Sequence, residues 1–297
     1  MELCLGTVQF GMDYGVFNQP KKDVDYCVDC LDYATQNGIN AIDTATAYGI
    51  AEEVVGKFIR KNTINRNKLF ISSKLLPNIL DDYEKEDYEK VILDNIKKQL
   101  SVLGTDYLDA YFLHSSRYIH NPEILEALQI VKHEGLAKDV GVSIYYEDEA
   151  KVAFGNKNVQ YVQAPYSIFD HRMKKVGLFD KTKIGEMKVD TRTTFIKGLI
   201  RLSDSEIPEH LEKARPILRK LDEICNETGY NRIQLAIGYV KQQEVINHLV
   251  FGVRDLEQLK QDIEAFELDI PSDIFTKMDE EFKNIDTDIV VPSLWKR

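Results

Sequence analysis

Cysteine, proline and tryptophan are scarce in this sequence: its 297 residues include 4 Cys, 8 Pro and 1 Trp. So few cysteines exclude a disulfide scaffold, and so few prolines exclude a proline-rich linker. No apolar run approaches the roughly 20 residues that a membrane helix needs. The opening residues, MELCLGTVQF, have neither a basic region nor an apolar core, so no secretory signal is expected and the predicted location is cytoplasmic.

Positive charge is also in deficit, because 38 Lys and Arg stand against 49 Asp and Glu and the formal net charge is −11. Nucleic acids and anionic membranes bind basic surfaces, so neither is expected as a partner. A local positive pocket for one phosphorylated ligand is compatible with this balance. The acidic composition gives no signal for an oligomer interface. No His, Cys, Asp or Glu spacing matches a zinc site, so no metal is expected.

Cys27 and Cys30 form a C-x-x-C, which a redox pair or half of a zinc site would also show. A redox motif normally stands at the start of a helix that follows a strand. Here the pair lies in the middle of the amphipathic stretch DVDYCVDCLDYATQNG. We therefore interpret the two thiols as neighbours one helical turn apart rather than as a reactive site.

The hydrophobic pattern alternates between short apolar runs rich in β-branched or aromatic residues and longer stretches with helical periodicity. The short runs predict strands at residues 3–8, 39–43, 69–74, 107–113, 139–143, 159–163, 191–196 and 248–252. The periodic stretches predict helices at residues 23–36, 51–60, 88–103, 122–134, 147–154, 207–228, 231–242, 256–266 and 272–282. Alternating strands and helices over this length predict a single-domain (β/α)8 TIM barrel spanning residues 1–297.

A doubly wound open sheet is the alternative fold. Such a sheet usually carries G-x-G-x-x-G after its first strand, and the spacing Gly6-x-x-x-x-Gly11 does not match that pattern. In a barrel the chemistry lies at the carboxyl ends of the strands. The barrel therefore directs attention to the polar residues that close the predicted strands.

Asp43, Lys74 and His114 each close a predicted strand, and Tyr48 follows Asp43 in the next loop. Each residue alone has an ordinary structural explanation, as a helix cap, a solvated strand end, a hydrogen-bonded histidine or a loop aromatic. Together they make a chemical set. A lysine ammonium lowers the pKa of a neighbouring phenol, a carboxylate holds the ammonium, and an imidazole orients a carbonyl oxygen. Such a general acid still needs a nucleophile, and a hydride from a reduced cofactor fits that need.

These residues stand in segments that resemble the aldo-keto reductases, bacterial members above all, over nearly the whole chain. The resemblance is carried by LGTVQFG (5–11), GINAIDTATAYGIAEEVVG (38–56), LFISSKL (69–75), LDAYFLHSS (108–116), GLAKDVGVS (135–143), VQAPYSIFD (162–170), FIKGLI (195–200) and GVRDLEQL (252–259). It implies a (β/α)8 barrel that reduces carbonyl compounds with NADPH, or with NADH. It also implies that Tyr48 is the general acid, that Lys74 depresses its pKa, that Asp43 pairs with Lys74 and that His114 orients the carbonyl.

The same resemblance implies a set of cofactor-binding residues. Ser143 and Gln163 would hold the carboxamide, and Phe195 would stack on the nicotinamide ring. The pyrophosphate would lie against the backbone of Ile196, Lys197, Gly198 and Leu199, and the adenosine end against Gly252, Arg254, Gln258 and Asp262. Arg254 matches the residue that binds the 2′-phosphate of NADPH, but Asp255 stands where many members have Ser or Asn, and a carboxylate there would repel that phosphate.

Substrate contacts are expected from loops above the barrel, and Phe17 and Arg117 join Tyr48 and His114 as candidates. Arg117 would bind a carboxylate or phosphate of the substrate, or pair with a neighbouring loop acid. The mixture of residue types indicates a small polar carbonyl compound such as a sugar or keto acid. Two other functions stay open: a regulatory protein that binds the cofactor with little turnover, and a barrel lyase that uses Lys74 as a Schiff-base nucleophile.

Overall fold

Eight parallel strands close into a barrel in the computed structural model, which describes residues 1–61 and 65–295. Each strand pairs with its neighbours in chain order, and β8 closes the barrel on β1. The strands are β1 (Glu2–Gly6), β2 (Ala41–Asp43), β3 (Phe70–Leu75), β4 (Leu108–Leu113), β5 (Ala137–Ser143), β6 (Tyr161–Pro165), β7 (Lys188–Arg192) and β8 (Ile246–Gly252). The predicted (β/α)8 fold is confirmed, and the open-sheet alternative is excluded.

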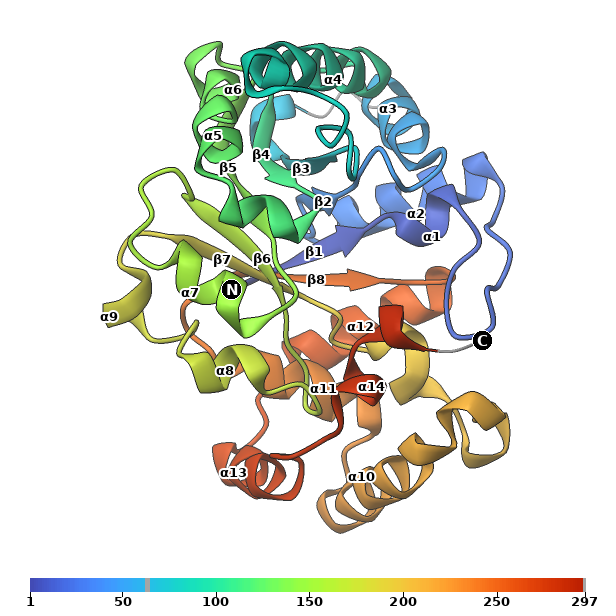
Figure 1. Cartoon of the computed structure of the whole chain (residues 1–297). Helices are drawn as coiled ribbons and strands as arrows, with labels where there is room; N and C mark the ends of the chain where they lie inside the picture. Colours follow the sequence, from blue (N-terminus) through green and yellow to red (C-terminus); the bar gives the residue numbers. More distant parts are fainter. Residues whose placement is uncertain (62–64, 296–297) are drawn as a thin grey trace.

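Helices surround the strands, as Figure 1 shows. The α-helices are α1 (Val8–Gly11), α2 (Val24–Gln36), α3 (Ala51–Lys61), α4 (Tyr88–Leu103), α5 (Pro122–Ala127), α6 (Ile130–His133), α7 (Glu147–Ala153), α8 (Arg172–Val176), α9 (Lys181–Ile184), α10 (Arg215–Thr228), α11 (Arg232–Lys241), α12 (Leu256–Glu267), α13 (Ser272–Glu281) and α14 (Thr287–Val290). Short 3₁₀ helices are η1 (Arg66–Lys68), η2 (Lys85–Asp87), η3 (Ser116–His120), η4 (Ile196–Arg201), η5 (Asp204–Glu206), η6 (Glu209–Ala214) and η7 (Pro292–Leu294). No helix in the described part of the chain is long and apolar enough to span a membrane.

Local signals explain several helix ends. The carboxylate of Asp23 accepts a hydrogen bond from the backbone N–H of Tyr26 and starts α2. Helix α4 ends where Gly104 takes a left-handed conformation, with φ of 70°. Cys27 and Cys30 both lie buried on α2 as free thiols, and burial raises their pKa values to about 11 and about 12. These high pKa values agree with unreactive thiols that pack against the core.

Three predicted elements differ most from the structure, and the bounds of several others move by one or two residues. The predicted strand 191–196 lies too late in the chain, because β7 ends at Arg192 and the backbone turns away at Thr193 with φ of 69°. The predicted helix 122–134 is interrupted between α5 and α6. The predicted helix 207–228 is a 3₁₀ segment followed by α10, and Pro216 stands in the first turn of α10, because proline fits a helix start but not a helix interior.

Alternate residues of each strand face the inside of the barrel. Small and aromatic side chains fill the lower part, where Cys4, Ala41 and Val250 form one buried cluster and Ala110, Phe112 and Tyr161 form another. The larger core lies between the strands and the surrounding helices. The inward-facing positions at the carboxyl ends of the strands carry the polar residues of the site: Asp43, Lys74, Ser143, Gln163 and Arg192.

Candidate active site

Lys74 and Asp43 form a buried ion pair at the floor of the barrel mouth. Lys74 Nζ lies 2.7 Å from each carboxylate oxygen of Asp43 and donates to the Thr44 carbonyl oxygen at 2.9 Å. Asp43 also accepts hydrogen bonds from Ser72 Oγ at 2.9 Å and Gln163 Nε2 at 2.8 Å. Burial alone would lower the pKa of Lys74, but the Asp43 carboxylate and, after it, Tyr48 outweigh burial, and the pKa lies above its usual value. Lys74 is therefore a fixed positive charge.

Tyr48 lies beside this ion pair, in the loop between β2 and α3. Lys74 Nζ is 5.0 Å from the centre of the Tyr48 ring. Gly11 packs directly against the same loop: a β-carbon at this position would lie 1.7 Å from the Tyr48 carbonyl oxygen, so the loop can approach only a glycine here. Burial raises the pKa of the Tyr48 phenol, and Lys74 opposes that rise. The phenol thus holds its proton at neutral pH, with a cation beside it that stabilises the phenolate.

His114 faces Tyr48 from the end of β4. The two ring centres are 5.7 Å apart and the rings meet edge to face, with an interplanar angle of 87°. Burial, together with the charges of Lys74 and Arg192, lowers the pKa of His114 to about 3. Its Nδ1 atom is buried and has no hydrogen-bond partner among the described residues. The imidazole is therefore neutral near pH 7 and offers a hydrogen bond rather than a charge.

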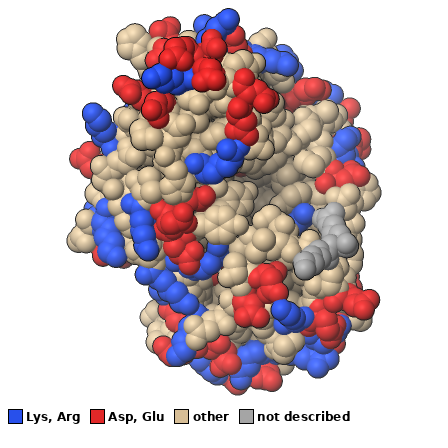
Figure 2. All heavy atoms as spheres, viewed as in Figure 1, with Lys and Arg blue, Asp and Glu red and all other residues tan. Residues whose placement is uncertain are grey.

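A cavity of about 540 Å³ opens above this group. In Figure 1 the arrowheads of β1 and β8 point to the side on which Figure 2 shows a hollow bordered mainly by uncharged residues. The predicted site residues that line the cavity are Phe17, Asp43, Tyr48, His114, Ser143, Phe195, Lys197, Gly198, Gly252, Arg254 and Gln258. One cavity thus collects predicted site residues that lie as much as 241 positions apart, between Phe17 and Gln258.

Other predicted residues lie away from the cavity wall. Lys74 and Gln163 lie buried beneath it, and the side chains of Ile196 and Leu199 are buried in the core. The carboxylate of Asp262 is buried too, where it forms an ion pair with Arg201.

Arg117 is exposed and does not line the cavity; it forms an ion pair with Asp81 and donates to Asn78 Oδ1 at 3.1 Å. The ion pair with Asp81 corresponds to the second of the two expectations for Arg117, that it pairs with an acidic residue of a neighbouring loop. A role of Arg117 in substrate binding stays a prediction.

The residues at the cavity floor fit a nicotinamide carboxamide. Ser143, the last residue of β5, is the register partner of Gln163 in the middle of β6. Gln163 Nε2 donates to Asp43, which leaves the buried Gln163 Oε1 without a hydrogen-bond partner in the described part of the chain. A buried acceptor without a partner costs about 1–3 kcal/mol, and an amide N–H would satisfy it.

The backbone of η4 fits a pyrophosphate. Lys197 and Gly198 have positive φ values of 57° and 96°, so the helix is interrupted where both residues line the cavity. Gly198 has nothing within 4 Å of its missing β-carbon, which leaves its backbone open to a ligand. Phe195 lies on the same wall, with the Arg201 guanidinium 4.3 Å from its ring centre.

Several residues of the cavity wall are absent from the sequence-based site, and three of them are charged: Arg192, Arg201 and Glu206. Arg192 was assigned to the interior of a strand placed too late in the chain, so its position at a strand end gave no signal. Arg201 and Glu206 come from the short 3₁₀ helices η4 and η5, for which the hydrophobic periodicity gave no signal. The inward-facing alternation of the true β7 would have identified Arg192.

Comparisons with known proteins agree with this geometry. Residues 2–282 match the family model described as "Aldo/keto reductase family". The chain is 27% identical to the "Uncharacterized oxidoreductase YqkF" of Bacillus subtilis, over 79% of this chain and 80% of that protein. It is 32% identical to the "Methylglyoxal reductase DkgA" of Escherichia coli over 46% of each chain.

The fold is similar to a solved structure, the aldo-keto reductase AKR11C1 from Bacillus halodurans in its holo form. The TM-score is 0.78 with 22% sequence identity, and the match covers 97% of this chain and 95% of that one. A family match over nearly all of the chain, a closed eight-stranded barrel and the expected residue set at its mouth lead to one conclusion. The chain belongs to the aldo/keto reductase family.

Proposed function

We propose that this protein is an NAD(P)H-dependent oxidoreductase that reduces an aldehyde or ketone to an alcohol, with Tyr48 as the proton donor. The observation that carries the proposal is the position of the Tyr48 phenol between the buried Lys74–Asp43 pair and the neutral His114, on the wall of a ligand-sized cavity. When bound, the nicotinamide supplies a hydride to the carbonyl carbon. Ser143 and Gln163 would hold its carboxamide.

Each residue then has one task. His114 donates a hydrogen bond to the carbonyl oxygen and orients it. Tyr48 Oη transfers its proton to the same oxygen as negative charge develops there, and Lys74 Nζ stabilises the phenolate that remains. Asp43 keeps Lys74 charged and in place. In the direction of alcohol oxidation the phenolate takes the proton back.

The alternative of a Schiff-base lyase is not favoured by the surroundings of Lys74. A Schiff base forms from a neutral amine, whereas the Asp43 contacts raise the pKa of Lys74 and keep the ammonium protonated. The amine also faces Thr44 and Asp43 beneath the cavity wall rather than the cavity itself.

A titration of protein fluorescence with NADH and, separately, with NADPH tests the proposal. Saturable binding is expected, followed by carbonyl-dependent oxidation of the bound cofactor with a panel of aldehydes and ketones. Failure to bind either dinucleotide would contradict the proposed function. Binding without turnover of any carbonyl compound would favour the regulatory alternative.

The choice between NADPH and NADH depends on charges at the expected adenosine end. Arg254, the residue expected to bind the 2′-phosphate, donates from Nε to Asp255 Oδ2 at 3.1 Å. Arg201 donates to both carboxylate oxygens of Asp262, at 2.5 and 2.7 Å. Both guanidinium groups therefore already face a carboxylate, and a phosphate would have to compete with it.

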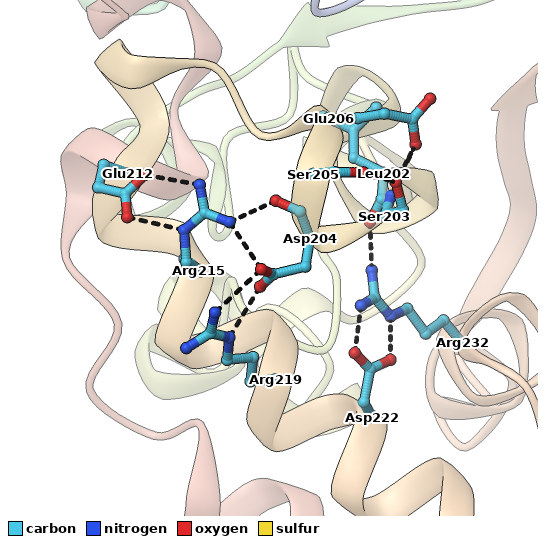
Figure 3. A network of polar contacts seen from close by, with 10 residues as sticks. All are labelled: Leu202, Ser203, Asp204, Ser205, Glu206, Glu212, Arg215, Arg219, Asp222 and Arg232. Carbon is cyan, nitrogen blue, oxygen red and sulfur yellow. Dashed lines mark hydrogen bonds and ion pairs between the residues drawn. The ribbon is translucent and has the colours of Figure 1, made fainter.

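Glu206 adds a further negative charge at this end, on the cavity wall at the end of η5. The segment is held firmly, because Asp204 forms ion pairs with both Arg215 and Arg219, each at 2.8 Å. Glu206 itself accepts from Ser203 N and Oγ and points away from those arginines (Figure 3). A carboxylate repels a 2′-phosphate and accepts a hydrogen bond from a 2′-hydroxyl, so these contacts support a preference for NADH.

Glu206→Gln is expected to raise the affinity for NADPH by about threefold or more at low salt and to leave the affinity for NADH within about twofold. The amide removes the charge that repels the 2′-phosphate and keeps the size of the side chain. Titration of both dinucleotides measures the ratio. Glu209→Gln is the matched control, since it removes the same charge from an exposed residue outside the cavity and is expected to leave the ratio unchanged.

A further inference from the structure

Glu52 is a buried carboxylate that forms no ion pair within the described part of the chain. It stands in the first turn of α3 and is 7% exposed. Five of the other six buried carboxylates among the described residues face a basic side chain: Asp43, Asp109, Asp170, Asp190 and Asp262. The sixth, Glu149, accepts from backbone N–H groups at the start of α7. A buried carboxylate without a cation must be held by other hydrogen-bond donors.

Neutral side chains hold this carboxylate outside the strands, where α3 and α4 lie side by side (Figure 1). Ser73 Oγ donates to Glu52 Oε1 at 2.6 Å, and Gln99 Nε2 donates to the same oxygen at 2.8 Å. Tyr111 Oη donates to Gln99 Oε1 at 2.7 Å and so holds the Gln99 amide with its N–H groups toward Glu52. Ser73, Gln99 and Tyr111 are buried. Four elements, α3, α4, β3 and β4, therefore meet in one buried network.

One side of this network contacts the strand segment that carries Lys74. Ser73 directly precedes Lys74 on β3, so the two side chains point to opposite faces of the strand. Gln99 Nε2, besides its bond to Glu52, donates to the Lys74 carbonyl oxygen at 3.0 Å. The backbone on both sides of the Lys74 α-carbon is therefore held from outside the barrel, while its ammonium is held by Asp43 inside.

The other side of the network contacts the loop that carries Tyr48. Tyr48 precedes Glu52 by four positions, and the Ala51 N–H donates to the Tyr48 carbonyl oxygen at 3.1 Å, so the loop runs directly into α3. Thr46 Oγ1, in the same loop, donates to Glu52 Oε2 at 3.4 Å. The two oxygens of one carboxylate thus connect the Tyr48 loop to the segment of Lys74.

The distance between these two segments matters for the chemistry of the site. Lys74 Nζ is 5.0 Å from the centre of the Tyr48 ring. After burial, the charges of Lys74 and Asp43 act most strongly on the pKa of the Tyr48 phenol. The stabilisation of a phenolate by an ammonium falls as the two groups move apart. A loop that moves away from β3 would therefore weaken the proton donor without removing any group of the site.

We propose that Glu52 is a positioning residue for the proton transfer: its carboxylate holds the Tyr48 loop against β3 and so fixes the Tyr48 phenol beside the Lys74 ammonium. The inference rests on the proposed function, because it assigns a residue that supports the same proton donor. Glu52 lies behind the strands and does not line the cavity, so it touches neither substrate nor cofactor. Its effect passes through Ser73, Gln99 and the loop, and hydrogen-bond acceptors rather than a negative charge are what the task requires.

Glu52→Met and Glu52→Gln test this role, because methionine removes both acceptors and glutamine keeps an acceptor oxygen for Ser73 and Gln99. Glu52→Met is expected to lower kcat by about tenfold or more, with KM and the Kd for NADH within about twofold. In the direction of alcohol oxidation its pH–rate profile should move to higher pH by about half a pH unit or more, since the phenolate is stabilised less. Glu52→Gln should recover most of kcat and the pH profile of the wild type.

Asp109→Asn is the matched control for a change that affects only stability. Asp109 is also a buried carboxylate that contacts β3, where it accepts from the Ile71 N–H at 2.9 Å near the start of the strand. Its other partners are Arg66 and Lys138, away from the cavity. Asp109→Asn should lower the free energy of unfolding in urea and leave kcat within about twofold and the pH profile unchanged.

An unchanged kcat and pH profile in Glu52→Met would overturn the assignment. A loss of kcat that Asp109→Asn shares, or that Glu52→Gln does not recover, would overturn it too, because stability or charge would then explain the loss. If Glu52→Met does not fold, Ser73→Ala replaces it, with an expected loss of kcat of about threefold and the same direction of the pH shift. A Ser73→Ala variant with the kinetics of the wild type would contradict the proposal.

If the wild type turns over no carbonyl compound, the proposed function fails separately, and hydrogen exchange followed by mass spectrometry then tests Glu52. Glu52→Met should raise the exchange rate of residues 44–50 by about fivefold or more and leave β7 and β8 unchanged. Asp109→Asn should not raise exchange in residues 44–50. Equal exchange of this loop in the wild type and in Glu52→Met would contradict the positioning role.

Discussion

Replacing Tyr48 with phenylalanine is expected to lower kcat for carbonyl reduction by about 10²–10⁴-fold, the usual contribution of a positioned general acid. The variant keeps the ring that meets His114 edge to face and loses only the hydroxyl that carries the proton. The Kd for the dinucleotide should therefore stay within about twofold. Steady-state kinetics and a fluorescence titration on the same preparation separate the two effects.

Tyr14 provides the matched control, because it is a second phenol on the same cavity wall with a lysine, Lys197, 4.8 Å from its ring centre. Burial raises the pKa of Tyr14 to about 12, and it has no counterpart of the Lys74–Asp43 pair. Tyr14→Phe should retain more than about a tenth of kcat. If Tyr48→Phe retained that much and Tyr14→Phe did not, the proton donor would be Tyr14.

The fold could be predicted from the sequence because its main signal is local. A strand that faces helices on one side and a packed barrel on the other needs apolar residues nearly throughout, and runs such as 107–113 have them. The same signal failed at β7, where Thr191 belongs to the strand but Thr193 and Thr194 do not. All three threonines are β-branched and suit a strand equally well. The strand ends because the backbone at Thr193 has a positive φ, which the residue type does not reveal.

The proximity of Asp43, Tyr48, Lys74 and His114 could be predicted because three of them stand at or next to strand ends, where one inward-facing position suffices to place a side chain, and Tyr48 follows in the next loop. Arg192 was missed although it obeys the same rule, because its strand was placed too late. Other contacts between side chains could not be specified from the sequence. Arg201 pairs with Asp262, 61 positions away, and the loop acid that pairs with Arg117 is Asp81, 36 positions away. Such pairs depend on where loops fold back, and periodicity does not encode that.

Lys74→Met is expected to destabilise the protein by about 3–5 kcal/mol, because it leaves the Asp43 carboxylate buried without its cation. The hydrogen bonds from Ser72 and Gln163 to Asp43 remain in the variant and still stabilise the carboxylate. We therefore expect a loss of stability nearer 3 than 5 kcal/mol. The activity of the folded fraction should fall by about 10²-fold or more, since the Tyr48 phenolate loses its stabilising charge. Urea unfolding measures the change in stability. Steady-state kinetics without denaturant, at a temperature at which the variant is folded, measure the change in activity.

A double variant separates the effect of the unpaired Asp43 charge on stability from the effect of the Lys74 ammonium on activity. Lys74→Met combined with Asp43→Asn removes both charges, and the asparagine keeps an oxygen that accepts from Ser72 and Gln163. The stability lost in Lys74→Met should therefore be largely regained, because no unpaired charge is left in the barrel. Activity should not return, because the ammonium beside Tyr48 is still missing. If activity returned together with stability, Lys74 would act only through the fold, and the phenolate would need no cation beside it.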